Sequence, residues 1–62
     1  PEHHPWVGHK IKELDISRHT LIVMIRRGDN AIVPNGDTLI KTGDIVFVFS
    51  KRYMADAQTI SV

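Results

Sequence analysis

The sequence predicts a small α+β domain that forms a two-fold dimer, and its sheet is expected to be mostly antiparallel. Two uninterrupted apolar runs, residues 21–25 and 45–49, have the length and the β-branched or aromatic composition of strands. The residues between them are rich in Gly, Pro, Asn and Asp, which build tight turns. We therefore expect strands joined by turns, a short helix near the N-terminus and a short helical turn near the C-terminus.

The N-terminal helix is predicted from the spacing of three apolar side chains. Val7, Ile11 and Leu14 are four and three positions apart, so they share one face of a short helix that begins near Gly8. Residues 15–19 then favour a turn. A helix of about two turns is marginally stable alone, so its apolar face is expected to pack on the sheet.

The first full strand is predicted over residues 20–26. Regular alternation would place its side chains in two sets on opposite faces of the sheet. These sets are Leu21, Val23 and Ile25 on one face, and Ile22, Met24 and Arg26 on the other. Residues 27–30 have the composition of a tight hairpin turn, and residues 31–33 are expected to return as a short antiparallel strand that Pro34 ends.

The second half of the chain is expected to contain a short extended piece, a full strand and a helical turn. A turn with Pro and Asn-Gly precedes the extended piece at residues 38–40, and a Gly-Asp turn leads into the strand at residues 45–49. Residues 51–58 are predicted to form a short helical segment capped by Ser50, with the last residues fraying.

Both full strands are apolar at every position, so each needs cover on two faces. A chain of 62 residues has a thin core, because a domain of this size buries only about 60% of the surface of its unfolded chain. The sequence has no cysteine, which excludes disulfides. Oligomerisation is then the favoured means of stabilisation, and a second copy is expected to cover the second face.

Composition narrows the classes of function. A formal net charge of +1 gives no electrostatic reason to expect a nucleic-acid partner. No apolar run approaches the ~20 residues that cross a bilayer, so direct membrane insertion is not expected. The sequence has no nucleophile elbow and no phosphate-binding glycine loop, so we expect neither enzymatic activity nor a cofactor.

The sequence does not begin with Met and is expected to be part of a longer protein. Residues 1–6 are interpreted as a linker or a truncated first strand, and residues 7–62 as the domain. Its histidines leave a metal-binding domain as an alternative, since His3, His4 and Glu2 lie close to His9. Adjacent histidines lack the spacing of four that places two imidazoles on one helix face, so solvated histidines are favoured.

Basic pairs stand at the ends of the predicted strands. They are Arg18 with His19, Arg26 with Arg27, and Lys51 with Arg52. Cations at sheet margins discourage edge-to-edge pairing, so solvated strand ends are the simplest interpretation. In a two-fold dimer such pairs meet across the axis, where they would bind a symmetric, doubly anionic ligand.

The order of several segments resembles a known family. Residues 6–14, 21–28, 32–38 and 43–46 include an apolar strand ending in Arg, then Ile-Val-Pro, Gly-Asp-Thr and a final Gly-Asp before an apolar strand. Together they resemble the C-terminal regulatory domain of potassium-conductance proteins, called RCK-C or TrkA-C, over about residues 7–49.

The resemblance implies a cytoplasmic regulatory and dimerisation domain at the bacterial cell membrane, within a larger ion transporter or channel. Carriers of such domains include Trk and Ktr potassium uptake systems, cation/proton antiporters and ClC-type chloride channels. The expected partners are a second copy and the membrane-embedded part of the transporter. The family usually has one more strand before the predicted helix, where this chain has only residues 1–6. A ligand-free dimerisation or interaction module is the alternative.

Some members of the family bind cyclic di-AMP between two subunits, which the resemblance implies as a candidate ligand here. The matching positions are Ile11, Arg18, Ile22 and Pro34, with His19 nearby. Leu21 stands where those members place an Asn. The dimer interface is expected to involve Ile22, Met24, Ile32, Val33 and Pro34.

Overall fold

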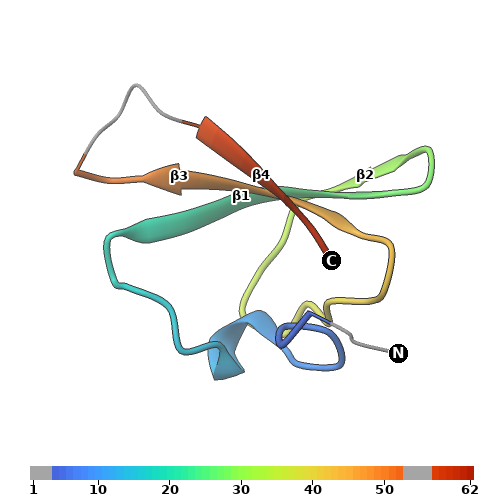
Figure 1. Cartoon of the computed structure of the whole chain (residues 1–62), viewed down its shortest axis with the longest axis horizontal. Helices are drawn as coiled ribbons and strands as arrows, with labels where there is room; N and C mark the ends of the chain where they lie inside the picture. The colour runs from blue at the N-terminus through green and yellow to red at the C-terminus, as the bar shows by residue number, and fades with distance from the viewer. Residues whose placement is uncertain (1–3, 53–56) are drawn as a thin grey trace.

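Four antiparallel strands form a single sheet, and most of the remaining chain lies on one side of it (Figure 1). This computed structural model describes residues 4–52 and 57–62. The order in the sheet is β2-β1-β3-β4. The element bounds are η1 Ile11–Glu13, β1 Thr20–Arg27, β2 Asn30–Ile32, β3 Ile45–Ser50 and β4 Ala57–Ser61. The predicted antiparallel sheet is confirmed, whereas the helical part of the predicted α+β class is reduced, in the described residues, to the 3-10 turn η1.

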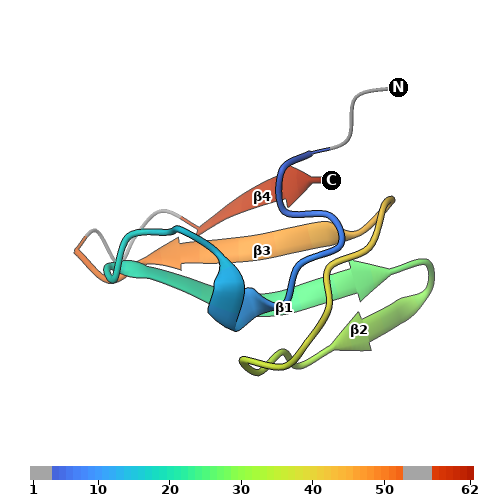
Figure 2. The ribbon, with the colours of Figure 1, turned by 90° about the horizontal axis from the view of Figure 1, so that it is seen from below.

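The irregular layer that contains η1 lies over one face of the sheet (Figure 2). The core lies between this layer and the sheet. Ile25 and Val46 are cross-strand partners on β1 and β3, and both are completely buried. Val48 lies on the same face, two residues further along β3. Ile40, from the loop before β3, packs against them. We call the sheet face that carries these side chains the inner face, and the opposite one the outer face.

A β-bulge in β1 changes which side chains share a face. Ile22 pairs with Val48 and Met24 pairs with Phe47, so the two pairs are one residue apart on β3 but two residues apart on β1. The inner face therefore carries Ile22 and Ile25, and the outer face carries Leu21, Met24 and Arg26. The predicted alternation along residues 20–26 is wrong because the extra residue, Val23, reverses it midway.

The predicted helix over residues 7–14 is wrong except for η1. Four backbone hydrogen bonds join this segment to residues 36–40 instead. Gly8 N–H donates to the Ile40 carbonyl (N···O 2.8 Å), and Ile40 N–H donates to the His9 carbonyl (3.0 Å). Two further N–H groups from η1 donate to the same segment. This pairing satisfies backbone groups of both segments at once, which a short isolated helix could not do.

The apolar packing predicted for this segment is largely retained. Ile11 and Leu14 pack against the core. Trp6, which the sequence assigns to the linker, packs there as well. Its backbone N–H donates to Nδ1 of His4 (3.2 Å), and the two rings meet edge to face with centroids 5.0 Å apart.

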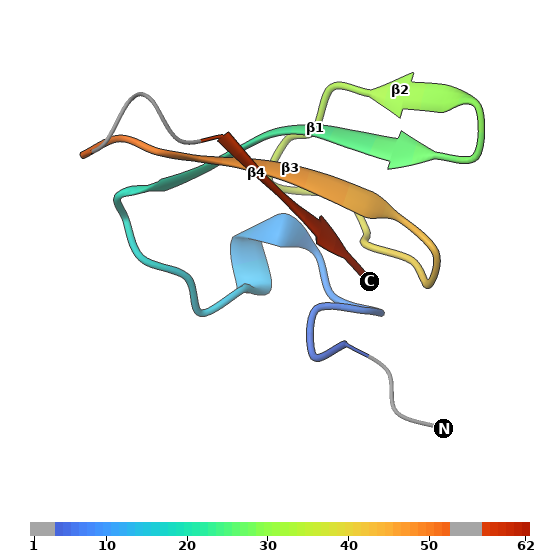
Figure 3. The ribbon, with the colours of Figure 1, turned by 45° about the horizontal axis from the view of Figure 1, so that its top comes forward.

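Residues 57–61 form a strand, where the end of the helical turn and a fraying terminus were predicted. β4 pairs with β3 along its whole length and is an edge strand of the sheet (Figure 3). Ile60 lies opposite Val46 and packs against the core, which holds the end that was expected to fray. Residues 53–56 of the predicted turn lie outside the described residues, whereas Ala57 and Gln58 are strand.

The predicted hairpin between β1 and β2 is confirmed. Arg27 pairs with Asn30 and leaves a two-residue turn. Gly28 is the first of these residues and has φ +60°, as type II′ turns require at that position. The returning strand β2 is shifted by one residue from the predicted range of 31–33.

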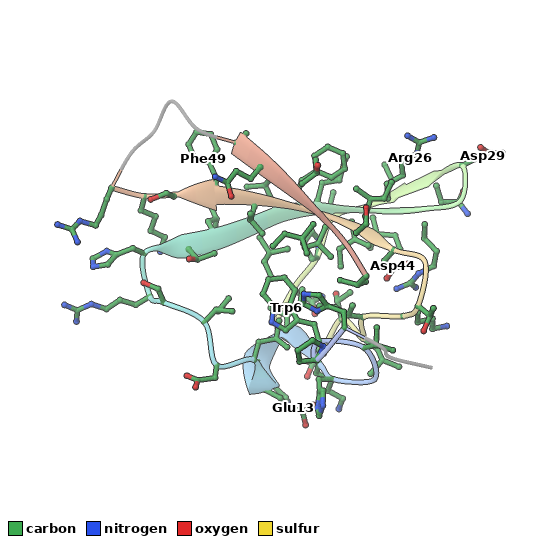
Figure 4. All side chains as sticks on the ribbon, viewed as in Figure 1. Trp6, Glu13, Arg26, Asp29, Asp44 and Phe49 are labelled. Atoms are coloured by element: carbon green, nitrogen blue, oxygen red, sulfur yellow. The ribbon has the colours of Figure 1, made fainter. Side chains whose placement is uncertain are left out.

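Asp44 is only 1% exposed and joins segments that are far apart in the sequence (Figure 4). Arg27, at the end of β1, donates from Nε to Oδ1 at 2.9 Å and from Nη2 to Oδ2 at 2.7 Å. The same Nη2 donates to the Leu39 carbonyl (2.9 Å), and the Lys41 N–H donates to Oδ2 of Asp44 (3.0 Å). Val62 N–H donates to the Asp44 backbone carbonyl (2.9 Å). Arg27 is therefore not one of the solvated strand ends that its position predicts.

Replacing Asp44 with Ala should lower the free energy of unfolding by about 2–4 kcal/mol, because the partly buried Arg27 charge and the Lys41 N–H lose their partner. Asp37→Ala is the matched control. Asp37 pairs with Lys12 at 2.8 Å on the exposed surface, where an ion pair contributes at most about 1 kcal/mol. Urea unfolding followed by circular dichroism measures both variants, and equal losses would contradict the assignment.

The same ion pair should make stability depend on pH. Hydrogen bonds from Arg27 outweigh the effect of burial and hold the pKa of Asp44 below its ordinary value. Because the folded-state pKa is the lower one, the carboxylate stabilises the fold above the unfolded-state pKa, and this contribution is lost as pH falls through the folded-state pKa. The stability difference between wild type and Asp44→Asn should be constant from about pH 7 to about pH 5 and shrink in acid. Urea unfolding at a series of pH values tests this, and a difference that persists unchanged in acid would disprove it.

Candidate functional site

A hollow of about 250 Å³ lies at the start of β1, bordered by η1 and by the loops that precede β1 and follow β2. Its walls are mostly apolar, with Thr20 and Asn35 as the polar side chains. The lining residues are Ile11, Ile16, Thr20, Leu21, Ile22, Pro34, Asn35 and Gly36. They come from separate segments, so the hollow exists only in the folded chain.

Two turns hold these walls in place. Before β1, Thr20 N–H donates to the Ser17 carbonyl (2.9 Å) and directs the chain into the strand. After β2, Asn35 N–H donates to Oγ1 of Thr38 (2.9 Å), and Oδ1 of Asn35 accepts the Asp37 N–H (2.8 Å). Such local bonds are typical of Ser, Thr and Asn in turns, so the local sequence itself shapes this rim.

The predicted ligand residues are partly brought together. Those that line the hollow are Ile11, Ile22 and Pro34. Arg18 and His19 do not line it, but they lie in the loop between Ile16 and Thr20, which both do. Sequence reasoning missed Ile16 and Asn35. Ile16 could have been found as the one large apolar residue in a polar turn.

The structure places the predicted interface residues at the core, on the outer face, after the end of β2 and at the hollow. Ile22 and Ile32 pack against the core. Met24 lies on the outer face, beyond the β-bulge. Val33 is 88% exposed after the end of β2. Pro34 lines the hollow. Contact of these residues with a second copy stays a prediction.

The outer face of the sheet is apolar, and the described chain gathers on the opposite side (Figure 1). By the strand register it carries Leu21, Met24, Ile45, Phe47 and Phe49. Leu21 and Val23 are 45% and 44% exposed. Figure 4 shows Phe49 on the side of the sheet away from η1, whereas Trp6 lies on the side of η1. Each full strand therefore packs one face on the core, whereas the layer of described residues that contains η1 leaves its other, apolar face uncovered.

Comparison with known families decides the assignment of this chain. The sequence model of the TrkA-C domain matches residues 1–57. The chain belongs to the TrkA-C domain family. The resemblance predicted from the sequence is confirmed.

Curated relatives of this TrkA-C domain include the "Trk system potassium uptake protein TrkA" of two Mycobacterium tuberculosis strains, CDC 1551 / Oshkosh and ATCC 25618 / H37Rv. Each is 37% identical over 49 residues, which cover 77% of this chain and 22% of the relative. The TrkA-C domain thus spans about a fifth of the length of these relatives. No solved structure shows a significant similarity to it.

Neither a metal-binding cluster nor a membrane-spanning helix occurs in residues 4–52 and 57–62 of the TrkA-C domain. No group of three or more His, Cys, Asp or Glu side chains gathers there to hold a metal ion. His9 lies 3.9 Å from Glu13, but this is an exposed pair, and His3 and Glu2 lie outside the described residues. No described helix is long and apolar enough to cross a membrane.

Proposed function

We propose that this TrkA-C domain is a non-catalytic regulatory domain of a bacterial potassium transport system, on the cytoplasmic side of the membrane and within a larger protein. The family match over residues 1–57 and the printed names of the curated relatives support this proposal. Its partners would be a second copy and the membrane-embedded part of the transporter.

The observation that carries a ligand-sensing role is the hollow at the start of β1. Ile11, Ile22 and Pro34 are distant in sequence, and all three positions correspond to ligand contacts in the family resemblance. They meet in one apolar hollow. Its apolar walls suit a flat base, and Arg18 in the adjoining loop suits a phosphate. Cyclic di-AMP is the ligand that these features fit.

The size of the hollow favours a site completed by two subunits. About 250 Å³ falls below the roughly 300–1,000 Å³ of typical ligand sites. Cyclic di-AMP is itself two-fold symmetric, so one such hollow from each of two copies would enclose its two bases. Leu21 lines the hollow and also belongs to the outer face, which places the hollow at the margin of the open apolar surface.

The outer face is the proposed dimerisation surface. Its apolar side chains come from both full strands, and the charged side chain on it is Arg26. A second copy packed there would remove this surface from water and supply the cover that the strands need on their second side.

Regulation would follow from a difference in affinity. A ligand between two copies changes their arrangement only as far as it binds one arrangement more tightly than another. The membrane-embedded part would respond to that change. A ligand-free dimerisation module is the second candidate, and Leu21 favours it, because an apolar side chain stands where ligand-binding members have an Asn.

Calorimetric titration with cyclic di-AMP tests the sensing role. Binding is expected in wild type, and Arg18→Ala should weaken it roughly 10- to 100-fold through loss of a charge-assisted hydrogen bond. Lys41→Ala removes an exposed cation in the loop before β3, outside both the hollow and the outer face, so it is the control and should bind like wild type. Absence of heat with the wild-type dimer would leave the ligand-free module as the function.

Analytical ultracentrifugation at tens of micromolar tests the dimer. The wild type is expected to sediment as a dimer, and Leu21→Lys should shift it toward monomer, because a charge would be buried at the interface. Leu39→Lys is the matched control, since Leu39 is 40% exposed and lies in the layer on the inner side of the sheet. A monomeric wild type, or equal effects of the two variants, would exclude the outer face as the dimer surface.

A further inference from the structure

The edge strand β4 is open to pairing with another strand. It pairs with β3 alone in the described sheet, and Figure 2 shows it at the margin opposite β2. Soluble proteins guard such edges with charged side chains, prolines, bulges or a very short strand. β4 has five residues, none of them charged and none Pro, and its register with β3 runs without a shift. The other edge strand, β2, has only three residues.

A hydrogen bond just after β4 fixes which of its backbone groups face outward. Val62 N–H donates to the Asp44 carbonyl (2.9 Å), so these two residues form a hydrogen-bonded pair of the antiparallel ladder. Such pairs occur at every second residue, so the even-numbered residues of β4 bond to β3. The N–H and C=O groups of its odd-numbered residues therefore point to the open edge. These residues are Ala57, Thr59 and Ser61.

We infer that β4 pairs antiparallel with β4 of a second copy, about a two-fold axis at Thr59. Thr59 is the middle residue of the strand, so this axis places Thr59 opposite Thr59 and Ala57 opposite Ser61. Each of these pairs can exchange two hydrogen bonds, so every outward group of both strands meets a partner. The edge is therefore complementary to itself, as a two-fold contact requires.

The side chains of β4 permit this approach. Thr59 lies opposite Phe47 of β3, so the odd-numbered side chains of β4 continue the outer face. They are small, uncharged and exposed. Two copies therefore meet without repulsion between like charges, and Thr opposite Thr is a favourable cross-strand pair. Pairing also joins the outer faces of the two copies into one continuous apolar surface.

This contact goes beyond the dimer proposed on the outer face. The family match ends at residue 57, so β4 lies almost wholly outside it. Edge pairing leaves both outer faces on the same side of a doubled sheet, where a second such sheet can pack. The two contacts together give an assembly of four copies.

The edge contact is expected to be the weaker of the two. It uses five residues from each chain, whereas a standard interface uses about 20–30 residues on each side. It should therefore form at higher concentration than the outer-face dimer. Within a larger protein that holds several copies together, effective concentrations reach the millimolar range, which is enough for such a contact.

Amide hydrogen exchange measured by NMR tests the contact on the wild-type chain. The Thr59 and Ser61 N–H groups should exchange rapidly at about 10 μM and at least about threefold more slowly at about 1 mM, where the paired edge is populated. The Gln58 and Ile60 N–H groups bond to β3 and should be protected at both concentrations. Rapid exchange of Thr59 at about 1 mM, or protection that does not change with concentration, would overturn the inference.

Thr59→Pro tests the outward hydrogen bonds by removing a donor. Proline is tolerated in an edge strand where the lost N–H faces solvent, so the ladder with β3 is kept. Thr59→Ala is the matched control, because it retains the N–H. At about 1 mM, wild type and Thr59→Ala should sediment as four copies, and Thr59→Pro as the outer-face dimer alone. Circular dichroism checks that the variants fold.

A second variant covers the case in which Thr59→Pro does not fold. Thr59→Lys keeps every backbone donor and places two like charges about 5.5 Å apart at the axis, measured between backbone Cα atoms, so it should also prevent edge pairing. Equal sedimentation of Thr59→Lys and Thr59→Ala at about 1 mM would overturn the inference.

Leu21→Lys separates the edge contact from the outer-face dimer. With the outer face disrupted, this variant should still form a dimer through β4 at about 1 mM, and adding Thr59→Pro should make it a monomer. The two contacts can therefore fail independently. An assembly that gains no copies between about 10 μM and about 1 mM, in wild type and in Leu21→Lys alike, would overturn the inference.

Discussion

The ion pair between Asp44 and Arg27 is the interaction on which the rest of the structure depends. A carboxylate that is 1% exposed is costly unless it is paired and hydrogen-bonded, and here it receives donors from Arg27 and from the Lys41 backbone. The pair fastens the loop before β3 to the end of β1, and the Asp44 carbonyl receives Val62 after β4. Because that loop carries Ile40 into the core, the pair also positions the layer that covers the inner face.

The β-bulge at Val23 divides the apolar residues of β1 between two surfaces. On one side of the sheet, Ile22 and Ile25 complete the core of this chain. On the other, Leu21 and Met24 join the phenylalanines of β3 in an open apolar face. With an unbroken alternation, Ile22 and Met24 would have shared one face of the sheet, and Leu21 and Ile25 the other. The bulge therefore places Leu21 and Met24 together on the outer face, which is the surface proposed for a second copy. It also brings Ile22 to the hollow proposed for a ligand.

The features proposed to bind a ligand and a second copy converge at the start of β1. The apolar hollow and the margin of the outer face both include residues from 16 to 22. The opposite end of β1 has a different role, since Arg27 is engaged by Asp44 and the hairpin closes there.

Local sequence determined the apolar strands, the hairpin at Gly28, the turn at Asn35 and the family, because each depends on neighbouring residues or on their order. Three of the five predicted ligand positions also met in one hollow. Only the tertiary structure decided the bulge at Val23, the replacement of the predicted N-terminal helix by pairing with residues 36–40, and the strand β4. It also decided the burial of Asp44. These features depend on partners distant in the chain, whose hydrogen bonds and packing outweigh local propensity and leave no periodic signal in the sequence.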